Sequence, residues 1–118
     1  MQGGQRQPGF DPALGKVDTE VDGHLLLITI DRAAKYNGFT PQMARQLAEA
    51  YEQLESDPAL RVGVVRAAGK HFTAGLDLPR FAENMKAGRS SWPEELVNPM
   101  DLTDRRRSKP VVFAVKGI

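Results

Sequence analysis

Apolar and polar positions along the chain form blocks that predict strands and helices in turn. Three short apolar runs are rich in branched side chains and are bounded by Gly, Pro, Asp or basic residues, which is typical of buried strands. They are residues 25–30 (LLLITI), 61–66 (RVGVVR) and 111–115 (VVFAV). Between the first two runs, apolar side chains from Met43 to Leu54 recur at helical spacing, which predicts an amphipathic helix.

The sequence also predicts where this helix starts and ends. Thr40 followed by Pro41 predicts the start, because a hydroxyl side chain caps the first turn and proline needs no hydrogen-bond acceptor there. Asp57-Pro58 predicts the end, because a residue before proline is disfavoured in the α conformation. A second, shorter helix is expected after residue 77, with an apolar face formed by Leu78, Phe81, Ala82 and Met85.

The stretch from residue 86 to residue 108 has no sustained hydrophobic period. Gly88, Pro93 and Pro99 interrupt any long helix, so we expect a mobile or pocket-lining loop. The order of the elements is then strand, helix, strand, helix, strand. That alternation predicts an α/β fold with parallel strands.

The N-terminal segment differs in composition from the rest of the chain. Residues 1–20 contain four of the eleven glycines, two prolines and few large apolar side chains, which predicts a flexible arm and a folded domain over residues 21–118. The first residues lack the apolar core of a secretory signal, so a cytoplasmic location is expected. No apolar run approaches the roughly 20 residues that span a bilayer, so we expect no membrane span.

Composition and charge exclude several classes of function. The 118 residues fit one globular domain, and 16 Lys+Arg against 15 Asp+Glu leave a net charge of +1, so an obligate nucleic-acid binder is not expected. With no cysteine and two histidines, neither a disulfide nor a metal site is predicted. The basic run at residues 105–107 (RRR) is interpreted either as a solvated face or as a contact for phosphate.

The most informative segment is residues 70–78 (KHFTAGLDL), between a predicted strand and a predicted helix. Thr73, Ala74 and Gly75 are small enough to let a ligand approach the backbone, and the first N–H groups of the following helix have no acceptor within it. Such a place can stabilise an anion, including a thioester oxygen that gains charge. The composition is equally compatible with a turn at Gly75 and a helix cap at Asp77.

Four segments resemble, in order, the crotonase (enoyl-CoA hydratase/isomerase) superfamily. Residues 31–40 (DRAAKYNGFT) are similar to its Arg-x-x-x-x-Asn-Ala-Leu-Ser/Thr motif, although proline is usual where Ala33 stands, and residues 57–69 are similar to its Asp-Pro, strand and glycine segment. Residues 70–78 contain the Phe-x-Ala-Gly-x-Asp-Leu core, and residues 109–117 (KPVVFAVKG) resemble the Lys-Pro-Val-Ile-Ala-Ala-Val-x-Gly strand. The resemblance covers residues 21–118 and implies the N-terminal half of a crotonase-like ββα spiral fold.

The resemblance also implies roles for particular residues. The backbone N–H of Leu76 matches the first of two donors that form an oxyanion hole for acyl-CoA thioesters. Thr73, Ala74 and Gly75 match backbone that runs along the CoA, and Asp77 follows the donor. Two more residues, Lys35 and Arg32, stand where family members approach the CoA phosphates, although a solvated lysine is an equal interpretation of the first.

An acyl pocket and a reaction are implied in the same way. Residues 81–102 correspond to a region that often lines the acyl pocket, so Phe81, Met85 and Trp92 are candidate acyl contacts, with core packing as the alternative for the first two. The second donor and the catalytic glutamates lie further along in the family. We therefore expect the N-terminal part of an enoyl-CoA hydratase (a lyase) or isomerase, which hydrates 2-enoyl-CoA when complete.

The contrasting interpretation is a non-catalytic fragment, or a CoA-thioester-binding subunit that lacks a general base. No cofactor is expected, since acyl-CoA is the substrate, and the family implies trimers or hexamers.

Overall fold

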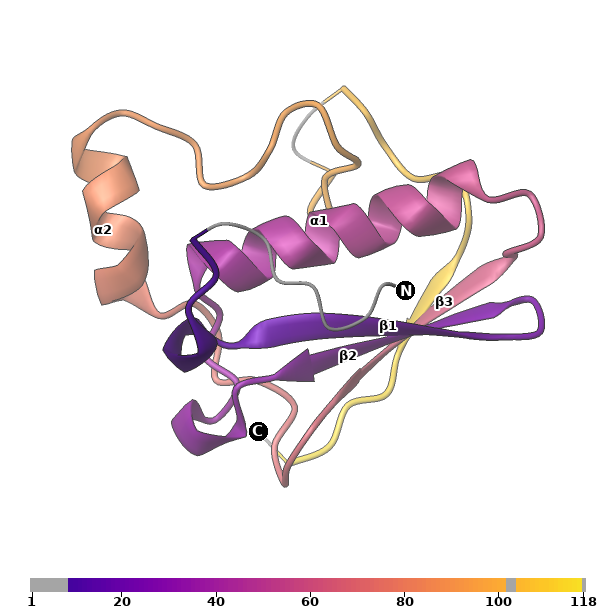
Figure 1. Ribbon diagram of the computed structural model, residues 1–118, viewed down its shortest axis with the longest axis horizontal. Helices are drawn as coiled ribbons and strands as arrows, with labels where there is room; N and C mark the ends of the chain where they lie inside the picture. Colours follow the sequence, from indigo (N-terminus) through magenta and orange to yellow (C-terminus); the bar gives the residue numbers. More distant parts are fainter. Residues whose placement is uncertain (1–8, 102–103, 118) are drawn as a thin grey trace.

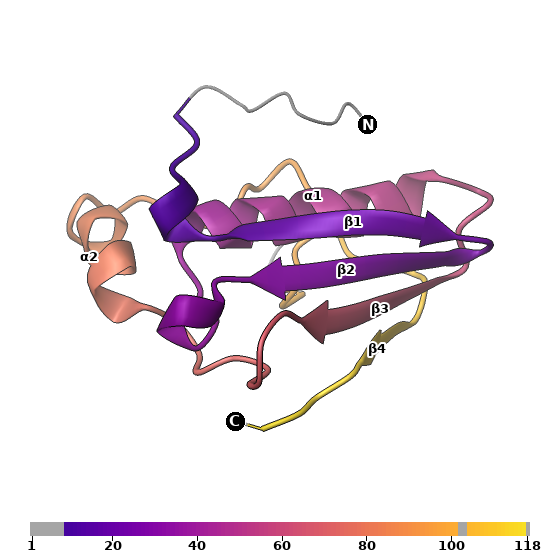
Figure 2. The same ribbon diagram turned by 60° about the horizontal axis from the view of Figure 1, so that its bottom comes forward.

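The computed structural model describes residues 9–101 and 104–117, which contain a four-stranded sheet in the order β1-β2-β3-β4 (Figures 1 and 2). The strands are β1 (Lys16–Asp22), β2 (Leu25–Asp31), β3 (Val62–Ala67) and β4 (Val111–Phe113). The β1–β2 pair is antiparallel, and β2, β3 and β4 run parallel to one another. The three strands expected from the apolar runs are therefore confirmed, and they are parallel as predicted.

Two α-helices, α1 (Pro41–Ser56) and α2 (Leu78–Lys86), and two 3-10 turns, η1 (Pro12–Leu14) and η2 (Ala33–Lys35), complete the described elements. The Thr40 side chain caps α1 by accepting a hydrogen bond from the Met43 N–H at 3.2 Å, and α1 ends at Asp57 before proline, as the sequence predicts. Helix α1 lies across one face of the sheet, whereas α2 stands beyond its end (Figure 2).

The core lies between α1 and the sheet. Alternate residues of β2 face the helix, and Leu26, Ile28 and Ile30 are 0–1% exposed. The buried face of α1 includes Met43, Leu47, Tyr51 and Leu54. Burial of each such side chain stabilises the fold by about 1.5–3 kcal/mol, so this layer supplies the rigid base on which the loops at the strand ends stand.

The expectation of a flexible arm over residues 1–20 is wrong for residues 16–20, which belong to β1 and pair with β2. Composition misled the prediction because β1 has one exposed face and only Val17 is buried, yet the turn at Gly23 (φ 62°) lets the whole strand pair as a hairpin. Residues 11–15 are also held, because the Gln42 side chain bonds the backbone of Asp11 and Gly15. Residues 1–8 lie outside the described part.

The expected loop over residues 86–108 begins after α2 and crosses α1 on the side away from the sheet (Figure 1). Its described part is irregular but attached, since Val97 is fully buried and Arg105 pairs with Glu52 of α1. Lys109 follows it and donates from Nζ to the Leu54 and Asp57 carbonyls, both at 2.7 Å. No helix in the described residues is long and apolar enough to cross a membrane.

Candidate functional site

The backbone around Leu76 forms a single parallel bridge with Phe39. The Phe39 N–H donates to the Gly75 carbonyl at 2.8 Å, and the Asp77 N–H donates to the Phe39 carbonyl at 2.7 Å. In a parallel bridge of this pattern Phe39 uses its own N–H and C=O, whereas Leu76, the residue opposite, points its N–H and C=O away from Phe39. No acceptor for the Leu76 N–H lies within residues 9–101 and 104–117, and Leu76 is 52% exposed, so this donor is available to a ligand.

The neighbouring donors of the same loop are used internally. The Ala74 N–H donates to the Tyr36 carbonyl at 2.9 Å, and the Gly75 N–H donates to the Thr73 hydroxyl at 3.1 Å. That hydroxyl in turn donates to the Asn37 carbonyl at 2.7 Å. Gly75 has φ +99°, and a Cβ there would meet no atom within 4 Å, so its conformation rather than a lack of space requires glycine.

An ion pair between a buried arginine and a partly exposed aspartate connects the residues that flank the bridge. The Arg32 guanidinium, with its side chain 6% exposed, donates from Nη1 to Asp77 Oδ2 at 2.7 Å and to the Gly38 carbonyl at 3.1 Å. The hydrogen bond from Arg32 lowers the pKa of the Asp77 carboxyl. Asp77 is the N-cap residue of α2, as one interpretation of the sequence expected, but its side chain makes no capping hydrogen bond and is directed to Arg32 instead. Arg32 was expected to approach the CoA phosphates, but its guanidinium donates to acceptors of the protein itself.

Asn37 joins the two loops that follow β2 and β3. It is 1% exposed, its Oδ1 accepts from the Arg32 N–H at 2.6 Å, and its Nδ2 donates to the Ala68 and His71 carbonyls at 2.8 and 2.9 Å. It also adopts φ +54°, which asparagine tolerates better than most residues. Asn37 lies within the crotonase-like motif of residues 31–40, and no role for it was predicted from the sequence. The signal was an asparagine before glycine in the loop that follows a buried strand.

An apolar cavity of about 180 Å³ borders Leu76. It is comparable with a cavity of roughly 150 Å³ that holds benzene, so a short acyl group fits its size. Phe72 and Phe113 meet edge to face with ring centroids 6.0 Å apart, and both line it. The described lining holds no carboxylate, imidazole or amine; it consists of Ile30, Phe39, Leu47, Tyr51, Val65, Phe72, Thr73, Leu76, Pro99, Met100 and Phe113.

The three acyl-pocket candidates from the sequence do not line this cavity. Phe81 is buried at 5% exposed, Met85 is 69% exposed, and Trp92 is partly exposed. For Phe81 and Met85 the physical reason is the position of α2, which stands beyond the end of the sheet and apart from β4 (Figure 2). The lining instead comes from the sheet, α1 and residues 99–100.

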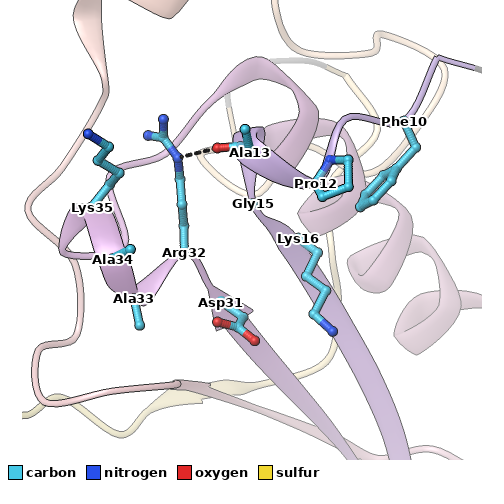
Figure 3. A pocket seen from close by; sticks show the side chains of 10 residues that line it. All are labelled: Phe10, Pro12, Ala13, Gly15, Lys16, Asp31, Arg32, Ala33, Ala34 and Lys35. Atoms are coloured by element: carbon cyan, nitrogen blue, oxygen red, sulfur yellow. Dashed lines mark hydrogen bonds between the residues drawn. The ribbon is translucent and has the colours of Figure 1, made fainter.

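Lys35 lies in a different place, a hollow of about 570 Å³ between η1 and η2 (Figure 3). Lys16 and Asp31 share the lining, and the figure shows the Arg32 Nε donating to the Ala13 carbonyl at 3.2 Å. The charged side chains that line the hollow are therefore those of two lysines, Arg32 and one aspartate. Within the described residues, no group of three His, Cys, Asp or Glu side chains could hold a metal ion.

The fold and the site define an α/β protein with parallel strands whose end loops present a backbone donor to an apolar cavity. Residues 20–118 match the sequence model of a family described as "Enoyl-CoA hydratase/isomerase". The chain belongs to the enoyl-CoA hydratase/isomerase family, the crotonase superfamily named by the resemblance.

Individual relatives agree with this assignment. Enoyl-CoA hydratase EchA19 of Mycobacterium tuberculosis is 32% identical over 99 residues, which cover 80% of this chain and 36% of the relative. The mevalonyl-coenzyme A hydratase SIDH of Beauveria bassiana is 32% identical over 104 residues, again 80% of this chain and 36% of the relative. The chain thus spans well under half the length of these relatives.

A solved structure confirms the fold. A probable enoyl-CoA hydratase/isomerase from Mycobacterium abscessus superimposes with a TM-score of 0.79 at 39% identity, covering 85% of this chain and 39% of that one. The prediction of a crotonase-like fold corresponding to an N-terminal half is therefore confirmed.

Proposed function

We propose that this chain forms the acyl-CoA cradle of an enoyl-CoA hydratase/isomerase, with the Leu76 N–H donating to the thioester carbonyl oxygen. The observation that carries the proposal is the Leu76 N–H, a donor that has no acceptor among the described residues and lies beside an apolar cavity of acyl size. A preorganised backbone donor acts most strongly where negative charge develops. An enolate oxygen formed from a thioester is such a charge.

The proposed reaction of the complete protein is hydration of a 2-enoyl-CoA. The oxygen of water bonds to C3 while a general base takes one of its protons, and the double-bond electrons move toward the thioester oxygen. The enolate then returns to the thioester carbonyl as a proton is delivered to C2. In the charged intermediate the Leu76 N–H stabilises the oxygen. The described lining of the cavity holds no carboxylate or imidazole. The proposal therefore takes its general base and second donor from outside the described residues.

The CoA part of the substrate is proposed to run along the backbone of residues 73–75, toward Lys35. Support comes from the exposure of Ala74 and Gly75 and from the two lysines of the hollow in Figure 3. Assembly into trimers or hexamers, a cytoplasmic location and the absence of a further cofactor stay predictions.

A second candidate function is a CoA-thioester-binding subunit that performs no chemistry. One observation favours it: apart from Thr73 and Tyr51, the side chains that line the cavity beside Leu76 are apolar. Crotonyl-CoA separates the two candidates, because hydration removes the enoyl absorbance. Turnover by the complete protein would exclude the second candidate, whereas tight binding without turnover by the complete protein would exclude the first.

The donor itself is tested with a matched pair of ligands, butyryl-CoA and S-butyl-CoA, which differ in the thioester carbonyl. We expect the 118-residue chain to prefer butyryl-CoA by about tenfold in Kd, the worth of one good hydrogen bond, measured by isothermal titration calorimetry. Leu76→Pro removes the N–H and is expected to abolish the preference. Leu76→Ala keeps the N–H, so it should weaken both ligands alike and retain the preference. Equal affinities in the wild-type chain would contradict the proposal.

A further inference from the structure

We propose that Arg32 is a positioning residue for the Leu76 donor, and that residues 11–15, which precede the family match at residue 20, hold Arg32 in place. This inference rests on the proposed function of Leu76. It adds a second part to the site, namely a support that the resemblance does not imply.

The guanidinium contacts both sides of the bridge that orients the donor. Gly38 immediately precedes Phe39, and Asp77 immediately follows Leu76; Arg32 Nη1 donates to the carbonyl of the first and to the carboxylate of the second. A single planar group thus connects the two backbone segments on either side of the bridge. Because Arg32 and Asp77 are both charged, the 2.7 Å hydrogen bond between them is shorter and stronger than a neutral one.

Residues 11–15 form an elbow against the other side of Arg32 (Figure 3). The Ala13 carbonyl accepts from Arg32 Nε at 3.2 Å, and the Leu14 carbonyl accepts from the Thr40 hydroxyl at 2.6 Å. At Gly15 (φ +78°), a Cβ would lie 2.8 Å from Arg32 Cβ and 2.7 Å from Met43 Sδ. The elbow therefore packs on the Arg32 side chain so closely that it tolerates no added atom there.

The low exposure of this pair indicates orientation rather than stability as its main role. The side chains of Arg32 and Asp77 are 6% and 23% exposed. An ion pair shielded from water often contributes little net stability, because desolvation offsets the attraction. Its directional hydrogen bonds nevertheless restrict the geometry of both partners. A backbone donor that must meet an oxygen within hydrogen-bond range needs such a fixed geometry.

The first test needs no ligand. Amide hydrogen exchange of Phe39 and Asp77, whose N–H groups form the bridge, is compared in the wild-type chain and in Arg32→Met, Arg32→Lys and Asp77→Asn. We expect exchange at both amides to rise by at least about tenfold in Arg32→Met, less in Arg32→Lys, with the β2–β3 amides changed by no more than about twofold. Asp77→Asn keeps the shape of the pair without its charge and decides the matter should Arg32→Met not fold. Unchanged exchange in both would overturn the proposal.

The second test uses the ligand pair. In Arg32→Met the preference for butyryl-CoA over S-butyl-CoA should fall from about tenfold to about twofold, while affinity for S-butyl-CoA changes little. Arg66→Met, an exposed arginine on β3 with a side chain 47% exposed, is the matched control and should leave the ratio unchanged. A role in folding alone would weaken both ligands equally. That outcome overturns the positioning role.

The elbow is tested with two glycines of similar backbone conformation. Gly15→Ala should raise exchange at Phe39 and Asp77 because its Cβ displaces Arg32, whereas Gly9→Ala, at φ +82° with no atom within 4 Å, should not. Equal effects of the two variants would overturn the role of the elbow. Equal affinities of the wild-type chain for both ligands, with the exchange results as expected, would refute the proposed function and leave Arg32 as a support of the loop only.

Discussion

Two loop regions of this protein are held by different physics. The loops after β2 and β3, which carry Asn37 and Leu76, are joined by buried hydrogen bonds to backbone carbonyls. The described part of the segment from residue 87 to Lys109 is attached to α1 by partly exposed charged groups, among them Glu52 and Arg105, in addition to the buried Val97. Buried bonds are costly to break and insensitive to salt, whereas exposed pairs are weak and screened. The donor therefore stands on the rigid region, and the segment over α1 is the one that conditions can loosen.

The largest effect is expected for Asn37→Ala. The substitution leaves the Arg32 N–H and the Ala68 and His71 carbonyls without this partner, and alanine is disfavoured at φ +54°. A loss of about 3–5 kcal/mol in the free energy of unfolding follows from several buried polar groups losing bonds together. Urea denaturation measures it. Asn84→Ala, whose side chain bonds only other side chains, is the control and should cost under about 1 kcal/mol.

Thr40→Val tests the same rigid region at its contact with the elbow. The valine keeps the shape but removes a hydroxyl that accepts from Met43 and donates to Leu14. We expect a loss of about 1–3 kcal/mol, the cost of a helix cap and an unpaired buried carbonyl. Thr29→Val on β2, where valine suits a strand, should be near neutral. Equal costs for the two would show that the cap does not act as described.

Lys109→Met tests the segment from residue 87 to Lys109 at its C-terminal end. The ammonium closes the last turn of α1 through the Leu54 and Asp57 carbonyls. Methionine retains the packing of the stem, so the loss is that of charged contacts to a helix C-terminus, about 1–2 kcal/mol. Thermal unfolding at low and high salt distinguishes this electrostatic cause, because salt should reduce the difference between variant and wild type. A salt-independent difference would contradict it.

The smallest effect at neutral pH is expected for Glu52→Gln, under about 1 kcal/mol for a partly exposed pair. The hydrogen bond from Arg105 lowers the pKa of Glu52 to about 2 from a usual 4.5. Since the folded pKa is depressed, the stabilisation is complete above pH 4.5 and is lost as the pH falls toward 2. The difference in unfolding free energy between wild type and Glu52→Gln should therefore shrink over that range. A constant difference would mean that the carboxylate does not sustain the contact.

Local sequence patterns were sufficient for most of the fold. The apolar runs and the Thr40-Pro41 and Asp57-Pro58 signals placed β2, α1, β3 and β4, because these features act over a few residues. The same kind of pattern failed for β1, since a strand with a single buried residue differs little in composition from a polar arm. β1 is ordered because it pairs with β2 along its whole length.

The candidate site divides in the same way. The sequence by itself determined the glycine at a positive φ and the small residues around Leu76, and it pointed to the family through short ordered motifs. Only the tertiary structure decided that the Leu76 N–H turns away from its bridge, that Arg32 joins Gly38 to Asp77, and which side chains line the cavity. Local conformation depends on neighbours in the chain, whereas a donor's direction and an ion pair depend on residues up to 45 positions apart meeting in the folded state.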